Sequence, residues 1–276
     1  MFTIAVGHAR YVEQALGLAR SLALVGDRTP RVLVTDVDHP DVPRWFDRVV
    51  PPPPTDQPYL LKLAGLDVTE EDHVLFLDSD MITFGRLDPI FDYFANAAFG
   101  ARGERITSGH WYGQVADYLP KLGLTGIPMI NGGMVAYGRT DASRAVLAEA
   151  RRVADAYPTL GLEAFRGKVP DEPCMAIAME RTGLGVLAPD DTQFMNTGFG
   201  IVGPIELDVM RRRCRYLQRG RQMRLKTPLL FHAATFVNYV AYWRELDKLK
   251  RLETAPTRSI SDKERMIVKE RLRRLA

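Results

Sequence analysis

An apolar run that stops abruptly at two carboxylates limits the possible folds of this chain more than any other part of the sequence. Residues 74–77 are apolar, and Asp78, Ser79 and Asp80 follow directly. A short apolar run is typical of a buried β-strand, which ends where its side chains reach solvent. Two acidic groups at such an end repel each other unless a cation lies between them. The pattern therefore predicts a buried strand that ends in a metal site.

Hard divalent cations suit this arrangement. Mg²⁺ and Mn²⁺ take oxygen ligands and are commonly held by one or two carboxylates together with the phosphates of a substrate. An ordinary turn is the alternative, because Asp and Ser are frequent loop residues and Asp-x-Asp often occurs by chance. The neighbouring segments are needed to choose between these two interpretations.

The first segments of the chain predict the βαβ unit of a parallel sheet. Residues 2–6 and 31–35 have the composition of strands, and residues 12–25 between them have the pattern of a helix. Nucleotides bind at the carboxyl ends of such strands. His8 is equally well interpreted as a polar loop residue that contacts no nucleotide. The residues expected at this edge are Val6, Gly7, His8, Tyr11 and Asp36.

An ordered series of short motifs begins with Lys62 in a short predicted helix, continues with Leu-Asp-Ser-Asp at residues 77–80, and reaches Leu-Asp-Pro-Ile-Phe at residues 87–91. This series resembles the GT-A glycosyltransferases, nearest to family 8, the family of glycogenin and the bacterial lipopolysaccharide galactosyltransferases. Asn-Gly-Gly-Met-Val at residues 131–135 resembles the family's segment beside the donor sugar, and Pro-Asp-Glu-Pro at residues 170–173 resembles its Asp-Gln step.

Two further matches complete the series, which runs from about residue 3 to residue 235. Residues 187–196 resemble the family's Leu-Pro…Phe-Asn stretch, and the strand predicted at residues 229–232 ends at His232, as the family's third metal ligand does. Two positions depart from the family. Glu172 stands where Gln is usual, and Asn238 stands where a diphosphate-contacting Lys is expected.

The resemblance implies an α/β protein of the GT-A type, with a Rossmann-like nucleotide-diphospho-sugar transferase fold whose mixed, mostly parallel central sheet is flanked by helices. It assigns the metal to Asp78, Asp80 and His232, and two carboxylates with an imidazole favour Mn²⁺ over Mg²⁺. The donor would be a UDP-hexose. The residues assigned to donor binding are Val6, Gly7, His8, Tyr11, Asp36, Lys62, Ser79, Gly132 and Gly133.

The same resemblance assigns catalysis to Asp171, Glu172 and Asn131. Family 8 enzymes retain anomeric configuration, so transfer here should retain it too. Glu172 would act as a nucleophile or stabilise an oxocarbenium-like transition state, and front-face attack by the acceptor is equally open. Helix capping is the alternative for Asp171 and Glu172, since acidic side chains favour the start of a helix. A solvated helix residue is the alternative for Lys62.

Positive charge is concentrated toward the C-terminal end. Residues 211–226 carry eight basic side chains and no acidic one, and residues 260–276 have the pattern of a basic amphipathic helix. These segments would bind an anionic membrane surface, a phosphorylated acceptor or nucleic acid. Packing on the domain or on a second subunit of a homodimer is the alternative. We expect a GT-A catalytic domain at residues 1–243 and a basic helical appendage at residues 244–276.

The composition excludes a disordered chain and a membrane-spanning one. Hydrophobic residues make up 46% of the sequence and charged residues 26%, which is typical of a folded globular protein. No apolar run reaches the roughly 18 residues of a membrane span, so we expect a cytoplasmic protein, with peripheral membrane contact as a variant. The leading function is metal-dependent retaining transfer of a hexose to an anionic acceptor: a lipid-linked sugar, a protein, or nucleic acid such as modified DNA. A noncatalytic sugar-nucleotide-binding protein is the alternative.

Overall fold

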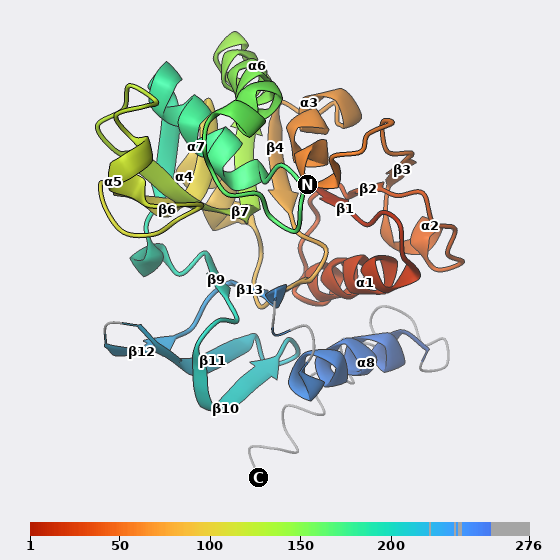
Figure 1. The fold of residues 1–276 in the computed structure, drawn as a ribbon. Helices are drawn as coiled ribbons and strands as arrows, with labels where there is room; N and C mark the ends of the chain where they lie inside the picture. Colours follow the sequence, from red (N-terminus) through yellow and green to blue (C-terminus); the bar gives the residue numbers. More distant parts are fainter. Residues whose placement is uncertain (221, 235, 237–238, 255–276) are drawn as a thin grey trace.

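Seven strands form the central sheet of the computed structural model, which describes residues 1–220, 222–234, 236 and 239–254 (Figure 1). In spatial order they are β3 (Arg48–Val50), β2 (Val32–Val34), β1 (Phe2–Ile4), β4 (His73–Leu77), β7 (Ile127–Gly138), β6 (Phe99–Ile106) and β8 (Gly185–Ala188). Strand β7 runs antiparallel to both of its neighbours, and the other pairs are parallel. The prediction of a mixed, mostly parallel sheet is confirmed.

Helices cover both faces of this sheet. One face packs against α6 (Asp141–Ala156) and α7 (Asp171–Thr182), and the other packs against α1 (Ala9–Leu24) and α4 (Asp88–Phe94) (Figure 1). The helix predicted around Lys62 is a 3₁₀ helix followed by one α-helical turn. The shorter helical segments are α2 (Val42–Trp45), η1 (Pro58–Ala64), α3 (Gly65–Val68), α5 (Val115–Tyr118), η2 (Tyr157–Thr159) and η3 (Asp190–Thr192).

Strand β4 is apolar at successive positions because helices cover both faces of the sheet there. Val74 and Phe76 lie in the core under α6 and α7, whereas Leu75 and Leu77 lie in the core under α1 and α4. Successive side chains of a strand point to opposite faces, so a strand covered on both sides buries all of them. The strand ends at Leu77, and Asp78 is the first residue beyond it. This is the end predicted from the sequence.

A small second sheet brings the third candidate metal ligand to the end of β4. Its strands, in spatial order, are β5 (Met81–Thr83), β13 (Leu230–His232) and β9 (Met195–Thr197). The central strand places His232 opposite Met81 on one side and opposite Thr197 on the other. Met81 directly follows Asp80, so this register sets the imidazole beside the two aspartates.

The arginine-rich segment predicted at residues 211–226 forms part of a third sheet. This antiparallel sheet contains β10 (Ile201–Asp208), β11 (Arg213–Arg219) and β12 (Met223–Lys226), and residue 221 lies outside the described residues. The sheet and α8 (Val240–Thr254) form the lower part of the molecule in Figure 1. Tyr242, Leu246 and Leu249 of α8 share a buried cluster with Tyr216.

The helix α8 runs through the predicted domain boundary between residues 243 and 244, and the division of the chain there stays a prediction. The basic amphipathic helix expected at residues 260–276 and Asn238 lie outside the described residues. Within the described part of the chain, no helix combines the length and the apolar character that crossing a bilayer requires. Cys174 and Cys214 are buried, unpaired thiols.

Candidate active site

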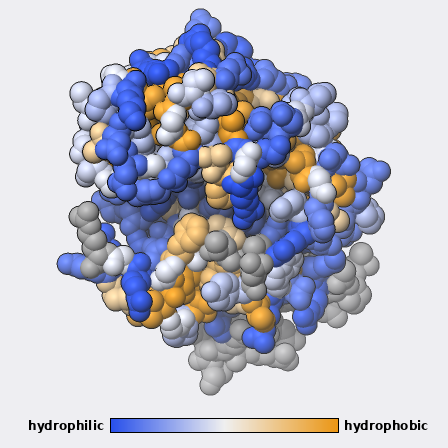
Figure 2. Space-filling model, viewed as in Figure 1, coloured by the Kyte–Doolittle hydropathy of each residue, from blue (hydrophilic) through white to orange (hydrophobic). Residues whose placement is uncertain are grey.

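A cleft of about 1620 Å³ opens at the carboxyl end of β4. Its walls come from the ends of β1, β4, β6 and β7 and from β9, β11, β12 and β13. Figure 2 shows a recess between the upper and lower parts of the molecule, lined mainly by hydrophilic residues. Sites for single small ligands usually enclose roughly 300–1,000 Å³. The cleft is therefore large enough for a nucleotide-sized ligand and a second molecule beside it.

Asp78, Asp80 and His232 converge in this cleft. One ligand atom from each lies within 4.8 Å of the other two. The Nε2 atom of His232 is 3.4 Å from Oδ2 of Asp78 and 3.2 Å from Oδ1 of Asp80. The second oxygen of Asp80 accepts a hydrogen bond from the Ala234 N–H at 2.9 Å, which fixes the direction of the first.

These three groups shift one another's pKa values. Burial raises the pKa of Asp78, although the charges of Lys62 and His232 oppose this. Burial would also raise the pKa of Asp80, but His232 and the Ala234 N–H outweigh it, so that pKa is lowered. Burial alone would lower the pKa of His232, yet the two carboxylates outweigh it and raise that pKa. The two carboxylates thus favour the protonated form of the imidazole, whose positive charge would offset theirs.

The three residues fit a hard divalent cation. Bonds of about 2.1 Å in octahedral geometry place neighbouring ligand atoms about 3.0 Å apart, close to the two distances from Nε2. Two carboxylate oxygens and one imidazole nitrogen form a donor set that suits Mg²⁺ or Mn²⁺. The Nδ1 atom of His232 is buried and has no hydrogen-bond partner among the described residues, so Nε2 is the ring nitrogen that faces the carboxylates. Imidazole must be neutral to bind a metal, so binding would release the proton held here.

Lys62 links this cluster to the start of α7. Its ammonium group lies 2.7 Å from Oδ2 of Asp171 and 3.4 Å from Oδ1 of Asp78, and it donates to the Gly132 carbonyl at 2.9 Å. Burial would lower its pKa, but Asp171 and Asp78 outweigh burial, and the pKa is raised above its ordinary value. The side chain is 12% exposed. Lys62 is therefore a buried bridging cation rather than the solvated helix residue of the alternative interpretation.

Strand β7 passes unusually close to these groups, because Gly132 and Gly133 carry no side chains. A Cβ atom at Gly132 would lie 2.4 Å from Oδ2 of Asp171, and one at Gly133 would lie 2.8 Å from the His232 ring. Such distances are sterically prohibited, so glycine is required at both positions for this arrangement. Next to them, Asn131 accepts from the Gly133 N–H and donates to Oγ1 of Thr197 at 3.0 Å.

Glu172 is held from two sides. Its Oε1 atom accepts from the Gly132 N–H at 2.9 Å, and its Oε2 atom accepts from the Tyr112 hydroxyl at 3.0 Å. Both contacts lead away from α7, so they are not the helix-capping contacts of the alternative interpretation. Burial, together with the nearby charge of Asp171, raises the pKa of Glu172 to about 7.

This shift predicts a pH-dependent stability. A carboxyl group whose pKa is higher in the folded state binds more protons there, so its contribution falls as pH rises from the unfolded value near 4.5 to about 7. The Glu172→Gln variant cannot ionise. We expect its free energy of unfolding relative to the unsubstituted protein to rise over this window, by up to about 3 kcal/mol. Urea unfolding of both proteins at several pH values in EDTA measures this difference. Free energies of unfolding that change with pH in the same way in both proteins would contradict the prediction.

Solved structures with similar folds are glycosyltransferases. The galactosyltransferase LgtC in complex with donor and acceptor sugar analogues matches with a TM-score of 0.51 and 16% identity, over 72% of this chain and 77% of its own. An active-site glutamine-to-glutamate mutant of LgtC matches with a TM-score of 0.57 and 15% identity, over 94% and 98%. The chain has the GT-A fold. The bifunctional glycosyltransferase WbbM matches with a TM-score of 0.51 and 15% identity, over 71% of this chain and 39% of WbbM. No protein-family model and no curated protein sequence matches the chain.

The N-terminal edge of this GT-A fold holds the residues expected around a nucleotide. Val6, Tyr11 and Ser79 line the cleft, and Tyr11 is 46% exposed. Gly7, His8 and Asp36 take part in hydrogen bonds with the backbone at this edge. The Gly7 N–H donates to Oδ1 of Asp36 at 2.7 Å, and His8 is the N-cap residue of α1, with its Nδ1 atom accepting from the Arg10 N–H. Their roles in ligand binding stay predictions.

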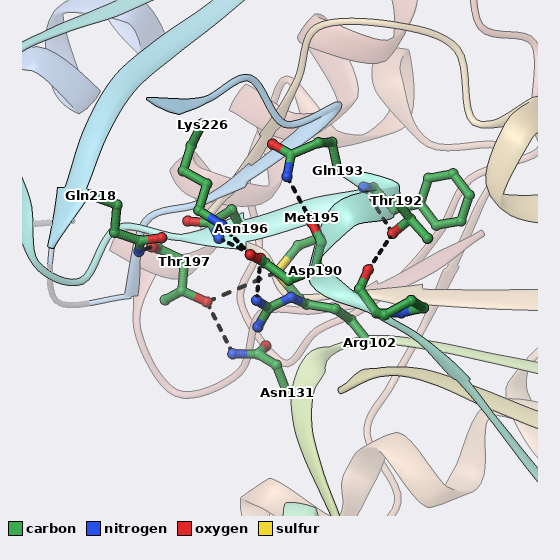
Figure 3. A network of polar contacts seen from close by, with 12 residues as sticks. Arg102, Asn131, Asp190, Thr192, Gln193, Met195, Asn196, Thr197, Gln218 and Lys226 are labelled. Atoms are coloured by element: carbon green, nitrogen blue, oxygen red, sulfur yellow. Dashed lines mark hydrogen bonds and ion pairs between the residues drawn. The ribbon is translucent and has the colours of Figure 1, made fainter. Parts of the chain in front are cut away.

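Several residues of the cleft were missed by sequence reasoning. Tyr112 lies in the loop between β6 and α5, and nothing in the sequence of that loop indicates a partner as distant as Glu172. A second group surrounds Asp190, which accepts from Arg102, Asn196 and Lys226 (Figure 3). Its members lie on separate elements, and no local spacing connects them. Within the GT-A fold they adjoin Asn131 and Thr197.

Proposed function

We propose that this chain is a metal-dependent retaining glycosyltransferase that moves a hexose from a UDP-sugar to an anionic acceptor. The observation that carries the proposal is the convergence of Asp78, Asp80 and His232 in a large cleft at the carboxyl end of β4. The GT-A fold supports the same activity, since LgtC and WbbM are glycosyltransferases. We propose a cytoplasmic enzyme, and Mn²⁺ over Mg²⁺ for its donor set.

Donor binding follows from the positions of the cleft residues. Tyr11 presents an exposed ring at the N-terminal edge, where it would stack on the uracil base. Asn131 and Asp171 would hold hydroxyls of the hexose. Ser79 and the β7 backbone at residues 132 and 133 would border the sugar and the diphosphate, because the two glycines let that backbone pack directly against Asp171 and the His232 ring.

The reaction breaks the bond between the anomeric carbon and the diphosphate oxygen and forms one to an acceptor hydroxyl, with UDP as the leaving group. A divalent cation held by Asp78, Asp80 and His232 would neutralise the charge of the departing diphosphate. Lys62 holds Asp78 and Asp171 in place through its two ion pairs. The acceptor hydroxyl loses its proton as the new bond forms, and an oxygen of the departing diphosphate would take that proton.

Glu172 has one of two roles in this reaction. As a nucleophile it would attack the anomeric carbon and form a covalent intermediate, whereas as an electrostatic group it would stabilise the positive charge that develops on the sugar. Hydrogen bonds from Gly132 and Tyr112 to its two oxygens restrict rotation of the carboxylate. This favours the electrostatic role, together with front-face attack by the acceptor.

The outer face of the β10-β11-β12 sheet suits an anionic surface. Leu217, Met223 and Leu225 are 44%, 49% and 50% exposed, and Arg213, Arg215 and Arg219 are exposed on the same part of the sheet. Figure 2 shows apolar residues gathered over this region. Exposed apolar groups flanked by arginines bind the interface of an anionic bilayer. We propose peripheral membrane contact here, and a homodimer contact as the competing use of the same face.

Metal-dependent donor hydrolysis tests the activity without knowledge of the acceptor. We expect the protein to release UDP slowly from one UDP-hexose when Mn²⁺ is present, and EDTA to stop the release. Other nucleotide sugars and Mg²⁺ serve as comparisons. Binding of UDP-sugars without any release of UDP, in the presence of Mn²⁺, would instead indicate a noncatalytic binding protein.

A further inference from the structure

Resting on the function proposed above, we infer that Arg102, Lys226 and Arg224 form an anion-binding subsite on the wall of the cleft, which holds a phosphate or carboxylate group of the acceptor sugar. The three residues line the cleft. They come from β6 and β12, whereas the metal cluster lies at the ends of β4 and β13. The subsite is therefore separate from the groups that would hold the donor diphosphate.

The first argument is a buried charge excess. Asp190 forms ion pairs with both Arg102 and Lys226, and the distance from Arg102 Nη2 is 2.7 Å. Two cations thus share one carboxylate, and Asn196 also donates to it. Lys226 is only 5% exposed and Arg102 is 23% exposed, so water screens the remaining positive charge poorly. A buried excess charge is costly unless an anion completes the group.

The second argument is an unused donor. The Nε atom of Arg102 is buried and has no hydrogen-bond partner within the described part of the chain. Most buried polar atoms in proteins are paired, so an orphaned guanidinium nitrogen beside a cleft indicates a missing acceptor. A guanidinium group presents its donors in a plane that matches two oxygens of a phosphate or carboxylate.

The third argument is the position of Arg224. It precedes Lys226 by two residues on β12, so both side chains leave the same face of that strand. Figure 3 shows Lys226 and Arg102 directed toward each other, with Asp190 between them. Glu104 and Arg224 both line the cleft and both are exposed to solvent, where their charges are screened, so the poorly screened excess charge is that of Arg102 and Lys226.

The subsite is connected to the proposed reaction centre through neighbouring strand residues. Arg102 is the register partner of Asn131, which donates to Thr197, and Thr197 is the register partner of His232. An acceptor anchored there by its anion would therefore have its hydroxyl groups near the donor sugar. In contrast, Lys62 is paired with two carboxylates, Asp78 and Asp171, so it offers no excess positive charge.

Calorimetric titration of three small sugars tests the inference. Glucose 6-phosphate, glucuronate and glucose are titrated into the metal-free protein in EDTA at low salt, so that neither metal nor donor takes part. We expect the matching anionic sugar to bind at least about 10-fold more tightly than glucose, and Arg224→Gln to weaken that binding about 10-fold. Comparison of glucose 6-phosphate with glucuronate shows whether the subsite prefers a phosphate or a carboxylate.

Two variants serve as controls. Arg102→Gln should weaken binding as Arg224→Gln does, and Arg144→Gln, an exposed substitution on α6, should not. Thermal melts verify that each variant is folded. Equal binding of all three sugars, no binding of any, or an equal loss in the Arg144 variant would overturn the inference. None of these outcomes bears on donor hydrolysis, which is measured separately. The inference about the subsite can therefore be wrong while the proposed activity is correct.

Discussion

Replacing Asp80 by alanine is expected to reduce UDP release from the donor sugar by on the order of 10³-fold, because in the proposed reaction this carboxylate would hold the cation that stabilises the leaving diphosphate. The carboxylate also holds the Ala234 N–H and faces the His232 ring. We therefore expect the Mn²⁺ affinity to fall together with the rate. Initial rates at saturating donor, with Mn²⁺ titrated in parallel by calorimetry, measure both quantities.

A matched pair of variants separates ligand loss from general damage. Asp80→Asn keeps the shape of the side chain and should lose nearly as much activity as Asp80→Ala. Asp92→Ala removes an exposed carboxylate from α4 and should leave both metal affinity and rate unchanged. If Asp80→Asn retained most of the activity and of the Mn²⁺ affinity, the assignment of the metal to this residue would be wrong.

The second large effect is expected for Lys62→Met, which removes the cation between two buried carboxylates. Breaking a buried ion pair from one side costs about 3–5 kcal/mol, because the remaining charge loses its partner. Burial raises the pKa of Asp78 and the charge of Lys62 opposes this, so without the ammonium group Asp78 binds a proton still more readily in the folded state than in the unfolded state. The stability lost in this variant should therefore grow as pH rises from 5 to 8. Urea unfolding in EDTA at these two pH values measures the difference.

A second substitution tests the cause of that loss. Removing the Asp171 charge as well, in Lys62→Met with Asp171→Asn, should recover part of the stability at pH 8 and little of it at pH 5. The activity should not return, since Asp171 is assigned to the sugar. Equal instability of the single and double variants at pH 8 would argue that Lys62 stabilises the fold through packing rather than through charge.

The β4 strand and its aspartates could be predicted from the sequence because the signal is local. An apolar run of one strand's length, followed at once by Asp78 and Asp80, indicates both the strand and its end. The strand order of the small sheet and the position of His232 could not be predicted from a local signal. They depend on the pairing of β13 with β5 and β9, which lie elsewhere in the sequence. Only the resemblance to family 8 indicated His232, and the structure places it beside the aspartates.

Side chains that act through distant partners could not be predicted. The assignment of Lys62 to donor binding stays a prediction, but its contacts with Asp171, Asp78 and the Gly132 carbonyl could not be predicted from the sequence. Tyr112 reaches Glu172 from a loop, and Lys226 reaches Asp190 from another sheet. The density of arginine in residues 211–226 suggested one basic surface. A strand alternates its side chains, so the structure divides that segment between the cleft and the outer face.

The pairing of β13 also gives the order in which this centre can assemble. Both aspartates emerge early during synthesis, but their imidazole partner arrives only after β10, β11 and β12 have been made. Until β13 inserts between β5 and β9, the proposed metal site lacks one of its three ligands and would bind an ion weakly. Metal binding would then be a late event in maturation, and ion occupancy would report that β13 has paired with both strands.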